Sequence, residues 1–433
     1  MKVKTTVCLL VFGLLFNSAS VLAQSGTTQF DAKTLKFDKV KFITKVNENR
    51  LGARPPLDGY AAVIIKDGVV VAEAAGGLAI RGNGGSQGTS MSVVTPADIG
   101  SAFKLVSFIT LLSVFEKRAA NNRARTVEAQ LNESILPYMP KAWRDYVNAP
   151  PNNNADVARL AKITFAQLMR HKSGFRKAVV PVGTPAAPFH YISTGVKQQD
   201  VGVRAYSNFN ATILTYLWPR LVDPASADKF DEQLAGKVAN DDHATYGKLY
   251  GDFFELWMNK NVFNVIQPVI RPSCDPGVDF PKRLPFIPFA RFYQNPLGGD
   301  NPQFWSEKGK NYGCHAQGGY YVSMRELAAF MANYQATNVL ISDKTREMMY
   351  DDSTAATRDD RLGWSTISAS AFAKQHFGVN AIHWHWGDNL GHTAIVSLPG
   401  GFIAVGTITG TGSSSTVYES LKEAWGAAVQ ANF

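Results

Sequence analysis

Two patterns of apolar and polar positions divide the chain. Between residues 60 and 72, two runs of Val, Ile and Ala flank the turn Lys66-Asp67-Gly68, which predicts a β-hairpin. From Ala381 onward, apolar runs separated by short turns predict further strands. Apolar residues at every third position predict a helix over about 33–50, and a last helix is expected over about 417–431.

The middle of the chain has a mainly helical pattern. Residues 101–117 are apolar at nearly every position, which is typical of a helix that is buried on most sides. Helical stretches with polar and Pro-rich connections follow over about 118–335. We therefore expect an α/β (α+β) fold. An antiparallel sheet would be built from the N- and C-terminal parts, flanked by helices, with the helical region inserted between them.

The first 23 residues have the pattern of a secretory signal peptide. Lys2 and Lys4 precede an apolar run, and Val21-Leu22-Ala23 fits a cleavage site after Ala23. A membrane anchor is the alternative, but the run is too short to span a bilayer and no charged flank follows it. We expect residues 24–433 to form one domain, periplasmic or secreted, with no membrane span.

Removal of the leader would leave two of the three cysteines, Cys274 and Cys314. An exported chain folds in an oxidising compartment, so we expect these two to form a disulfide. Two free buried thiols are the alternative.

The bulk composition indicates a folded globular protein, with 45% hydrophobic and 18% charged residues. The formal net charge is +9, but no basic run is interleaved with aromatic residues, so nucleic acid is not an expected partner. The expected partner is a small-molecule ester, amide or peptide, and the oligomeric state is open.

Ser101 and Lys104 stand three residues apart at the start of the buried helix, so both side chains share one helix face. A serine hydroxyl becomes a nucleophile when a base takes its proton. A desolvated lysine has a lowered pKa and can be that base. The alternative is an N-cap serine beside a lysine that extends to solvent.

Two further short segments offer groups of the same chemistry. Tyr206 can pass protons beside a lysine, and Asn208 has an amide that can orient an amine or a substrate carbonyl; a capped helix start is the alternative for this segment. Near the end of a predicted strand, His385-Trp386-Gly387 is followed by Asp388. Glycine would let a substrate lie close to the strand edge, and the Asp388 N–H could stabilise an oxyanion.

Three histidines near the C-terminus allow a metal site as a weaker interpretation. His383 and His385 alternate on the predicted strand, with His392 nearby. No zinc-binding motif or cysteine pair accompanies them, so we expect no metal and no cofactor.

These segments together resemble the penicillin-binding proteins and serine β-lactamases, in which S-x-x-K, Y-x-N and K-T-G or H-x-G occur in this order. The chain is most similar to the branch with class C β-lactamases and family VIII carboxylesterases. Further similarity lies in Ile163–Gly174, Gln317–Phe330 and Leu362–Trp364. The resemblance implies a β-lactamase/transpeptidase-like fold.

The same resemblance implies roles for the residues. Ser101 would be the acylated nucleophile, Lys104 and Tyr206 would share the general-base work, and Asn208 would position substrate. The N–H groups of Ser101 and Asp388 would form the oxyanion hole.

The third motif departs from that of most β-lactamases. His385 stands in place of the cationic lysine, and an ordinary histidine is mostly neutral near pH 7. Trp386 replaces a threonine hydroxyl, and Asp388 adds a negative charge. These differences disfavour an anionic β-lactam and favour a neutral ester or amide.

We therefore expect an exported serine hydrolase of the carboxylesterase or amidase type. A β-lactamase, a D,D-carboxypeptidase or D-aminopeptidase, and a non-catalytic binding protein on the same fold stay open as alternatives.

Overall fold

The structure is a computed structural model that describes 36–53, 58–82, 88–122, 125–176, 188–235, 243–274, 289–291, 315–350, 361–368, 381–389 and 391–430. The predicted signal peptide and Cys314 lie outside these residues. The signal peptide and the Cys274–Cys314 bond therefore stay predictions.

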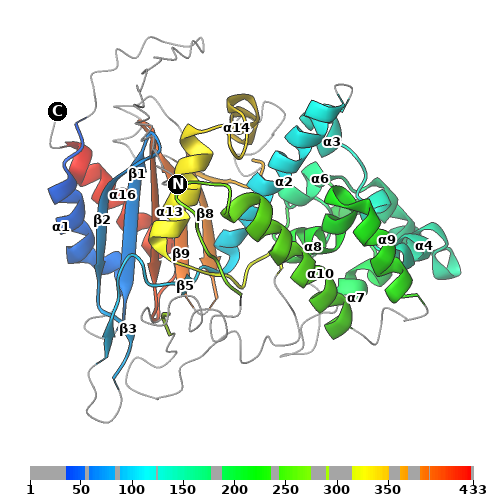
Figure 1. The fold of residues 1–433 in the computed structure, drawn as a ribbon, viewed down its shortest axis with the longest axis horizontal. Helices are drawn as coiled ribbons and strands as arrows, with labels where there is room; N and C mark the ends of the chain where they lie inside the picture. The colour runs from blue at the N-terminus through cyan, green and yellow to red at the C-terminus, as the bar shows by residue number, and fades with distance from the viewer. Residues whose placement is uncertain are drawn as a thin grey trace, which may run out of the picture. The chain divides into compact units, whose positions relative to one another are not determined.

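A six-stranded antiparallel sheet, in the order β2-β1-β10-β9-β8-β7, joins the two ends of the described chain (Figure 1). Its strands are β1 (Tyr60–Lys66), β2 (Val69–Gly76), β7 (Ser365–Ser368), β8 (Ala381–Asp388), β9 (His392–Leu398) and β10 (Phe402–Ile408). Tyr60 stands opposite Ile408 and Lys66 opposite Phe402, so the N-terminal hairpin pairs with the last strand. The expected fold class is confirmed.

The predicted hairpin forms at the expected turn. Asp67 and Gly68 have φ angles of 49° and 81°, and two consecutive positive φ values match the right-handed twist of the flanking strands. Gly68 suits this conformation because it has no Cβ.

Two helices from opposite ends of the domain pack beside each other on the sheet. These are α1 (Lys39–Asn49) and α16 (Ser414–Gln430); α1 contacts β2, and α16 contacts β8, β9 and β10. Figure 1 shows them on one side of the sheet, with α13 (Met324–Ala336) on the other side, where it contacts β1 and β10. The sheet is thus covered by helices on both faces.

The predicted buried helix is α2 (Phe103–Asn121), which follows a 3-10 turn at Gly100–Ala102. Every side chain from Phe103 to Phe115 is buried, in agreement with the apolar pattern. α2 packs against α8 (Phe209–Val222) and lies between the sheet and the helical region (Figure 1).

The helical region contains most of the remaining helices. They are α3 (Val127–Leu131), α4 (Lys141–Asn148), α5 (Ala155–Ala158), α6 (Phe165–Met169), α7 (Pro188–Thr194), α9 (Pro224–Gln233) and α10 (His243–Met258). The structure also has α14 (Asp343–Tyr350) and the short strands β3 (Leu78–Ile80), β4 (Thr89–Ser90), β5 (Ala97–Asp98) and β6 (Tyr321–Val322). Among the described residues no helix is long and apolar enough to span a bilayer.

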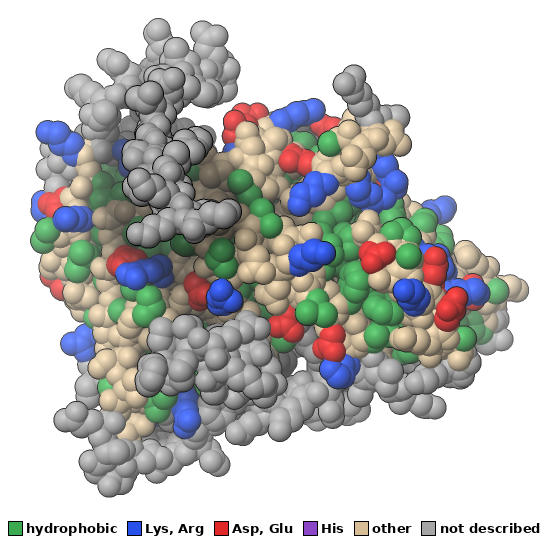
Figure 2. Space-filling view, viewed as in Figure 1, with side chains coloured by type: hydrophobic (Ala, Val, Ile, Leu, Met, Phe, Trp, Pro, Cys, Tyr) green, Lys and Arg blue, Asp and Glu red, His purple; other side chains and the backbone are tan. Residues whose placement is uncertain are grey.

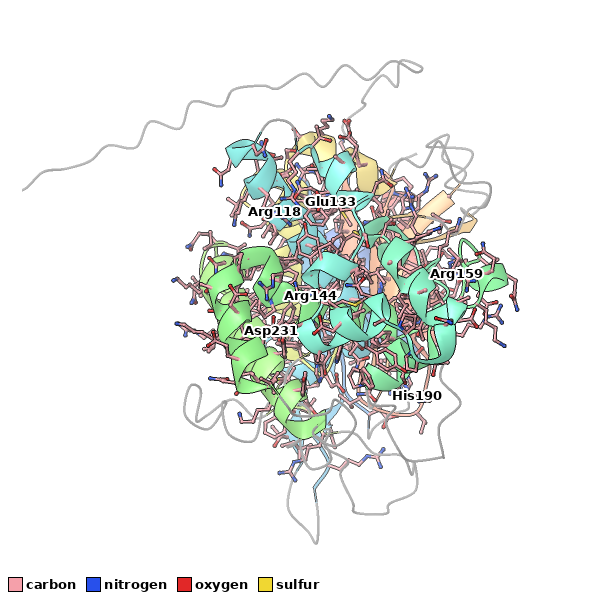
Figure 3. The ribbon with its side chains drawn as sticks, turned by 90° about the vertical axis from the view of Figure 1, so that its right-hand side faces the viewer. Arg118, Glu133, Arg144, Arg159, His190 and Asp231 are labelled. Atoms are coloured by element: carbon pink, nitrogen blue, oxygen red, sulfur yellow. The ribbon has the colours of Figure 1, made fainter. Side chains whose placement is uncertain are left out.

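Ion pairs tie neighbouring helices of this region together. Asp231 of α9 accepts hydrogen bonds from Arg220 at 2.6 Å and from Arg144 of α4 at 3.4 Å; Figure 3 shows the Arg144 and Asp231 side chains near each other. On the face seen in Figure 2, basic and acidic side chains are interspersed over the helical region. Such mixed charge produces no extended field of one sign on that face.

Candidate active site

Ser101 lies in a tight turn that short strands hold in place. β5 pairs with β6, and the Ile99 N–H donates to the Tyr320 carbonyl at 3.1 Å. Gly100 has a φ of 51°, a left-handed conformation that glycine adopts readily because it has no Cβ. The turn delivers Ser101 at the N-terminal end of α2, as the sequence predicts.

Lys104 is the immediate partner of Ser101. Its Nζ lies 2.6 Å from the Ser101 Oγ and donates to the Gln317 carbonyl at 3.0 Å. The side chain is fully buried, and burial lowers the pKa of the ammonium to about 7. The N-cap positions of the 3-10 turn and of α2 are Ile99 and Ala102 and not Ser101, and Lys104 is buried, so the alternative of an N-cap serine beside a solvent-directed lysine does not describe this pair.

Tyr206 lies beside both Lys104 and Ser101. Its ring centroid lies 5.3 Å from the Lys104 Nζ. Burial raises the pKa of the phenol, and a side-chain hydrogen bond with Ser101 lowers it in part. A neutral phenol in contact with Ser101 is suited to relay a proton, whereas Lys104, with its lowered pKa, is suited to accept one.

Asn208 makes no hydrogen bond to the Lys104 amine. It is exposed and precedes α8. In the described part of the chain, the Lys104 Nζ forms hydrogen bonds with the Ser101 hydroxyl and the Gln317 carbonyl. The carbonyl of Gln317 thus holds the amine, the role that we expected for the Asn208 amide. The exposed amide of Asn208 stays a predicted substrate contact.

The end of β8 is pressed against the Ser101 turn. A Cβ on Gly387 would lie 1.9 Å from the Ile99 carbonyl oxygen and 2.8 Å from the Ser101 nitrogen. A Cβ on Gly100 would lie 3.4 Å from the Asp388 nitrogen. Ser101 and Asp388 are therefore brought together where the turn meets the strand, and an oxyanion hole needs two backbone N–H groups that lie near each other.

One edge of β8 is open at this point among the described residues. β7 pairs with β8 from Ala381 to Trp384 and goes no further, while β9 pairs with β8 up to Asp388. The segment from His385 to Asp388 therefore has strand pairing on one side only, and its other edge is available to a substrate backbone.

Two histidines beside Lys104 are uncharged at neutral pH. Burial, followed by the charge of Lys104, lowers the pKa of both His171 and His385 to about 3. The ring of His171 packs 4.6 Å from that of Tyr206, and its Nδ1 lies 3.0 Å from the Asn210 Nδ2. His385 thus supplies no cation for an anionic substrate.

Trp386 and Asp388, the two neighbours of Gly387, have different surroundings. The Trp386 indole stacks on the Tyr206 ring at 5.7 Å and on Trp384 at 4.8 Å. The Asp388 carboxylate accepts from the Ser414 N–H at 2.8 Å and from the Ser414 hydroxyl at 2.7 Å, and it lies 2.7 Å from the His392 Nδ1. Its charge is therefore engaged by the first residue of α16.

Sequence reasoning missed two residues of the site, Asp98 and Gln317. Asp98 is fully buried and accepts from the Gly100 N–H at 2.8 Å and from the Asn389 amide at 2.7 Å. Burial raises the pKa of this carboxyl to about 6. The Gln317 side chain accepts from the Thr212 hydroxyl at 2.6 Å. An acidic residue three positions before the nucleophile was the available signal for Asp98.

Aromatic side chains of α8, of α10 and of the residues that follow α10 pack in the core of the helical region. Phe254 and Phe263 are fully buried, and the Trp218 ring contacts Phe254 and Trp257 at 5.1 and 5.2 Å.

The described residues, which include His383, His385 and His392, contain no group of three metal-ligating side chains.

Solved structures similar to this one share its fold. The class C β-lactamase from Rhodobacter sphaeroides superposes with a TM-score of 0.56 at 14% identity, covering 89% of this chain and 97% of that one. The β-lactamase from Sulfitobacter sp. EE-36 gives 0.58 at 15% identity, covering 91% and 97%. The D-amino acid amidase from Ochrobactrum anthropi SV3 gives 0.56 at 14% identity, covering 91% and 99%.

A sequence comparison with curated proteins gives no match. Residues 47–418, by contrast, match the family described as Beta-lactamase. This match spans most of the sequence and includes every residue of the site described above, and the chain therefore belongs to the Beta-lactamase family.

Proposed function

We propose that this protein is a serine hydrolase that cleaves a neutral ester or amide through an acyl-enzyme on Ser101. The single observation that carries the proposal is the 2.6 Å contact between the Ser101 Oγ and a fully buried Lys104 amine whose pKa is lowered to about 7. A non-catalytic binding protein has no need of a buried amine beside a serine, because burying an amine is unfavourable.

In the acylation step, neutral Lys104 takes the Ser101 hydroxyl proton while the Oγ bonds to the substrate carbonyl carbon. The carbonyl oxygen becomes an oxyanion, held by the N–H groups of Ser101 and Asp388. As the intermediate collapses, the bond to the leaving group breaks. The departing oxygen or nitrogen takes the proton from Lys104 by way of Tyr206. Water then repeats the sequence on the acyl-enzyme and releases the acid.

The choice of a neutral substrate rests on the charges of the site. His385 is uncharged near pH 7, Trp386 presents an indole, and the Asp388 carboxylate is engaged by Ser414. β8 itself offers no cationic side chain to a substrate carboxylate, and the Arg204 guanidinium beside it contacts the Ser365 hydroxyl of β7. The amide branch of the proposal is favoured by the fold shared with a D-amino acid amidase.

We also propose that the protein is exported, to the periplasm or out of the cell, and that Cys274 and Cys314 form a disulfide.

The test compares hydrolysis of p-nitrophenyl acetate with hydrolysis of a chromogenic cephalosporin by wild type and by Ser101→Ala. We expect Ser101-dependent ester turnover and weak cephalosporin turnover. Ester turnover that persists in Ser101→Ala would refute the mechanism. Strong cephalosporin turnover would instead favour a β-lactamase.

A further inference from the structure

Three aromatic side chains stand in a row beside the nucleophile. Tyr206, Trp386 and Trp384 have ring centroids 5.7 Å and 4.8 Å apart, with interplanar angles of 25° and 22°. Trp384 continues onto Tyr418 of α16 at 4.8 Å. We call Tyr206, Trp386 and Trp384 the aromatic wall. Its rings remain accessible: Tyr206 is 36% exposed, and both indoles are partly exposed.

The strand geometry fixes the direction of the wall. Trp384 and Trp386 are two residues apart on β8, so they project from one face, while His383 and His385 project from the other. Trp386 stacks on Tyr206, whose side chain is hydrogen-bonded to Ser101. The wall thus begins at the reacting atoms and extends along the strand towards α16.

Charges near the wall are already engaged. Lys422 lies over the Tyr418 ring at 4.9 Å and pairs with Glu419. The Asp388 carboxylate is bonded to Ser414. The Arg204 guanidinium lies 3.5 Å from the Oγ of Ser365, the β7 residue opposite Trp384, and is a further charged group near the wall. An apolar group placed against the wall itself contacts aromatic rings.

The path of the proton determines whether the acyl group or the leaving group of the substrate contacts the aromatic wall. The leaving atom must receive a proton through Tyr206, so it sits at the Tyr206 hydroxyl when the bond breaks. Trp386 is the ring stacked on Tyr206. Groups attached to the leaving atom therefore extend over Trp386 and Trp384, whereas the acyl group remains bonded to Ser101.

We propose that the aromatic wall is a leaving-group subsite for aromatic alcohols or amines. This inference rests on the proposed hydrolysis at Ser101. A ring held against the wall in both ground and transition state contributes apolar burial and aromatic contact, which corresponds to about a tenfold gain in kcat/KM over a methyl group.

The first experiment compares benzyl acetate with methyl acetate, whose alcohols are of nearly equal acidity, so that the ratio of kcat/KM reports the contact and not the chemistry. We expect a ratio of about ten in the wild type, falling to roughly two or three in Trp386→Ala and Trp384→Ala, with partial recovery in Trp386→Phe. Trp257→Ala removes an indole from α10, outside the site, and should leave the ratio unchanged.

A second experiment is independent of turnover. N-benzylacetamide and N-methylacetamide are titrated into Ser101→Ala by calorimetry, with and without Trp386→Ala. We expect the benzyl compound to bind about tenfold more tightly, and the difference to fall to roughly two- to threefold without Trp386.

The outcomes separate the subsite from the hydrolase. If turnover depends on Ser101 but the benzyl-to-methyl ratio of kcat/KM is near one, the subsite proposal is wrong and the hydrolase proposal still holds. The same conclusion follows if neither Trp386→Ala nor Trp384→Ala lowers the ratio. If neither ester is hydrolysed, the esterase proposal fails on these substrates, and the calorimetry alone decides the subsite. Equal binding of the two amides overturns it.

Discussion

The Asn389 amide donates a 2.7 Å hydrogen bond to the buried carboxylate of Asp98, 291 residues earlier in the chain. The other carboxylate oxygen accepts from the Gly100 N–H at 2.8 Å. Asp98 therefore joins the turn that carries Ser101 to the end of the strand that carries the Asp388 N–H. It holds the two expected oxyanion donors at a fixed separation without contacting substrate itself.

Asp98→Asn should reduce kcat by roughly tenfold or more, because the new amide group places a donor against Gly100 or Asn389. The double variant Asp98→Asn/Asn389→Asp again places an amide opposite a carboxylate. We expect it to recover much of the lost kcat, which a double-mutant cycle would measure. Equal kcat in Asp98→Asn and wild type would contradict the positioning role.

The pH dependence of stability provides a second test of Asp98. Its folded pKa of about 6 is above the ordinary value of 3.8, so the folded state binds more protons between these pH values. The Asp98 contribution to the free energy of unfolding is present below about pH 4 and is lost as pH rises through 6. The difference in the free energy of unfolding between wild type and Asp98→Asn, measured in urea, should change between about pH 4 and 6 and be constant above about pH 6.

Lys104 should set the acidic limb of the activity profile. With a pKa of about 7, the amine is protonated below that pH and cannot accept the Ser101 proton. We expect kcat/KM to rise with pH up to about 7 and then level off. Lys104→Arg, whose guanidinium stays charged, should lose activity by on the order of a thousandfold. An acidic limb displaced to pH 5 would assign the base to another group.

The same amine should destabilise the fold. Its folded pKa is below the ordinary 10.5, so wild-type stability rises between about pH 7 and 10.5, where the folded state binds fewer protons. Lys104→Met should therefore be inactive but more stable than wild type by on the order of 1–3 kcal/mol below pH 7. Urea unfolding of both proteins at pH 6 and pH 10 checks the sign.

Gly387→Ala should reduce activity by about a hundredfold, because its Cβ would collide with the Ile99 carbonyl and displace the Ser101 turn. Gly426 of α16 is the matched control, since a Cβ there meets nothing within 4 Å. Gly426→Ala should keep full activity and gain about 0.5–1 kcal/mol of stability. Steady-state kinetics and thermal unfolding of the two variants measure both effects.

His385→Lys would place a cation in a strand that now has a neutral imidazole. We expect the ratio of cephalosporin to neutral-ester turnover to rise, and the acidic limb of the activity profile to move below pH 7, because a second cation lowers the pKa of Lys104 further. His190→Lys adds the same charge at an exposed helical position and should change neither. An unaltered ratio in His385→Lys would show that the missing cation does not determine the substrate.

The strands, the turn at Asp67-Gly68 and the buried helix could be predicted because local periodicity and turn chemistry specify them. The expected proximity of Ser101 and Lys104 follows from helix geometry alone. The partners of Asp98, Gln317 and Asp388 could not be predicted. The partners of Asp98 and Gln317 depend on the pairing of β5 with β6. The partner of Asp388 depends on the position at which α16 begins, because Ser414 is the first residue of that helix. Such contacts join distant segments, and no periodicity in the sequence records them.

The pairing of β1 with the last strand, β10, has a consequence for the order of assembly. More than 300 residues separate the paired positions Tyr60 and Ile408, and closing so long a loop is slow. Ser101 is synthesised early, whereas the Asp388 N–H arrives only when most of the chain has been made. A nascent or truncated chain that lacks β8 should therefore be catalytically silent, and activity should appear together with closure of the sheet.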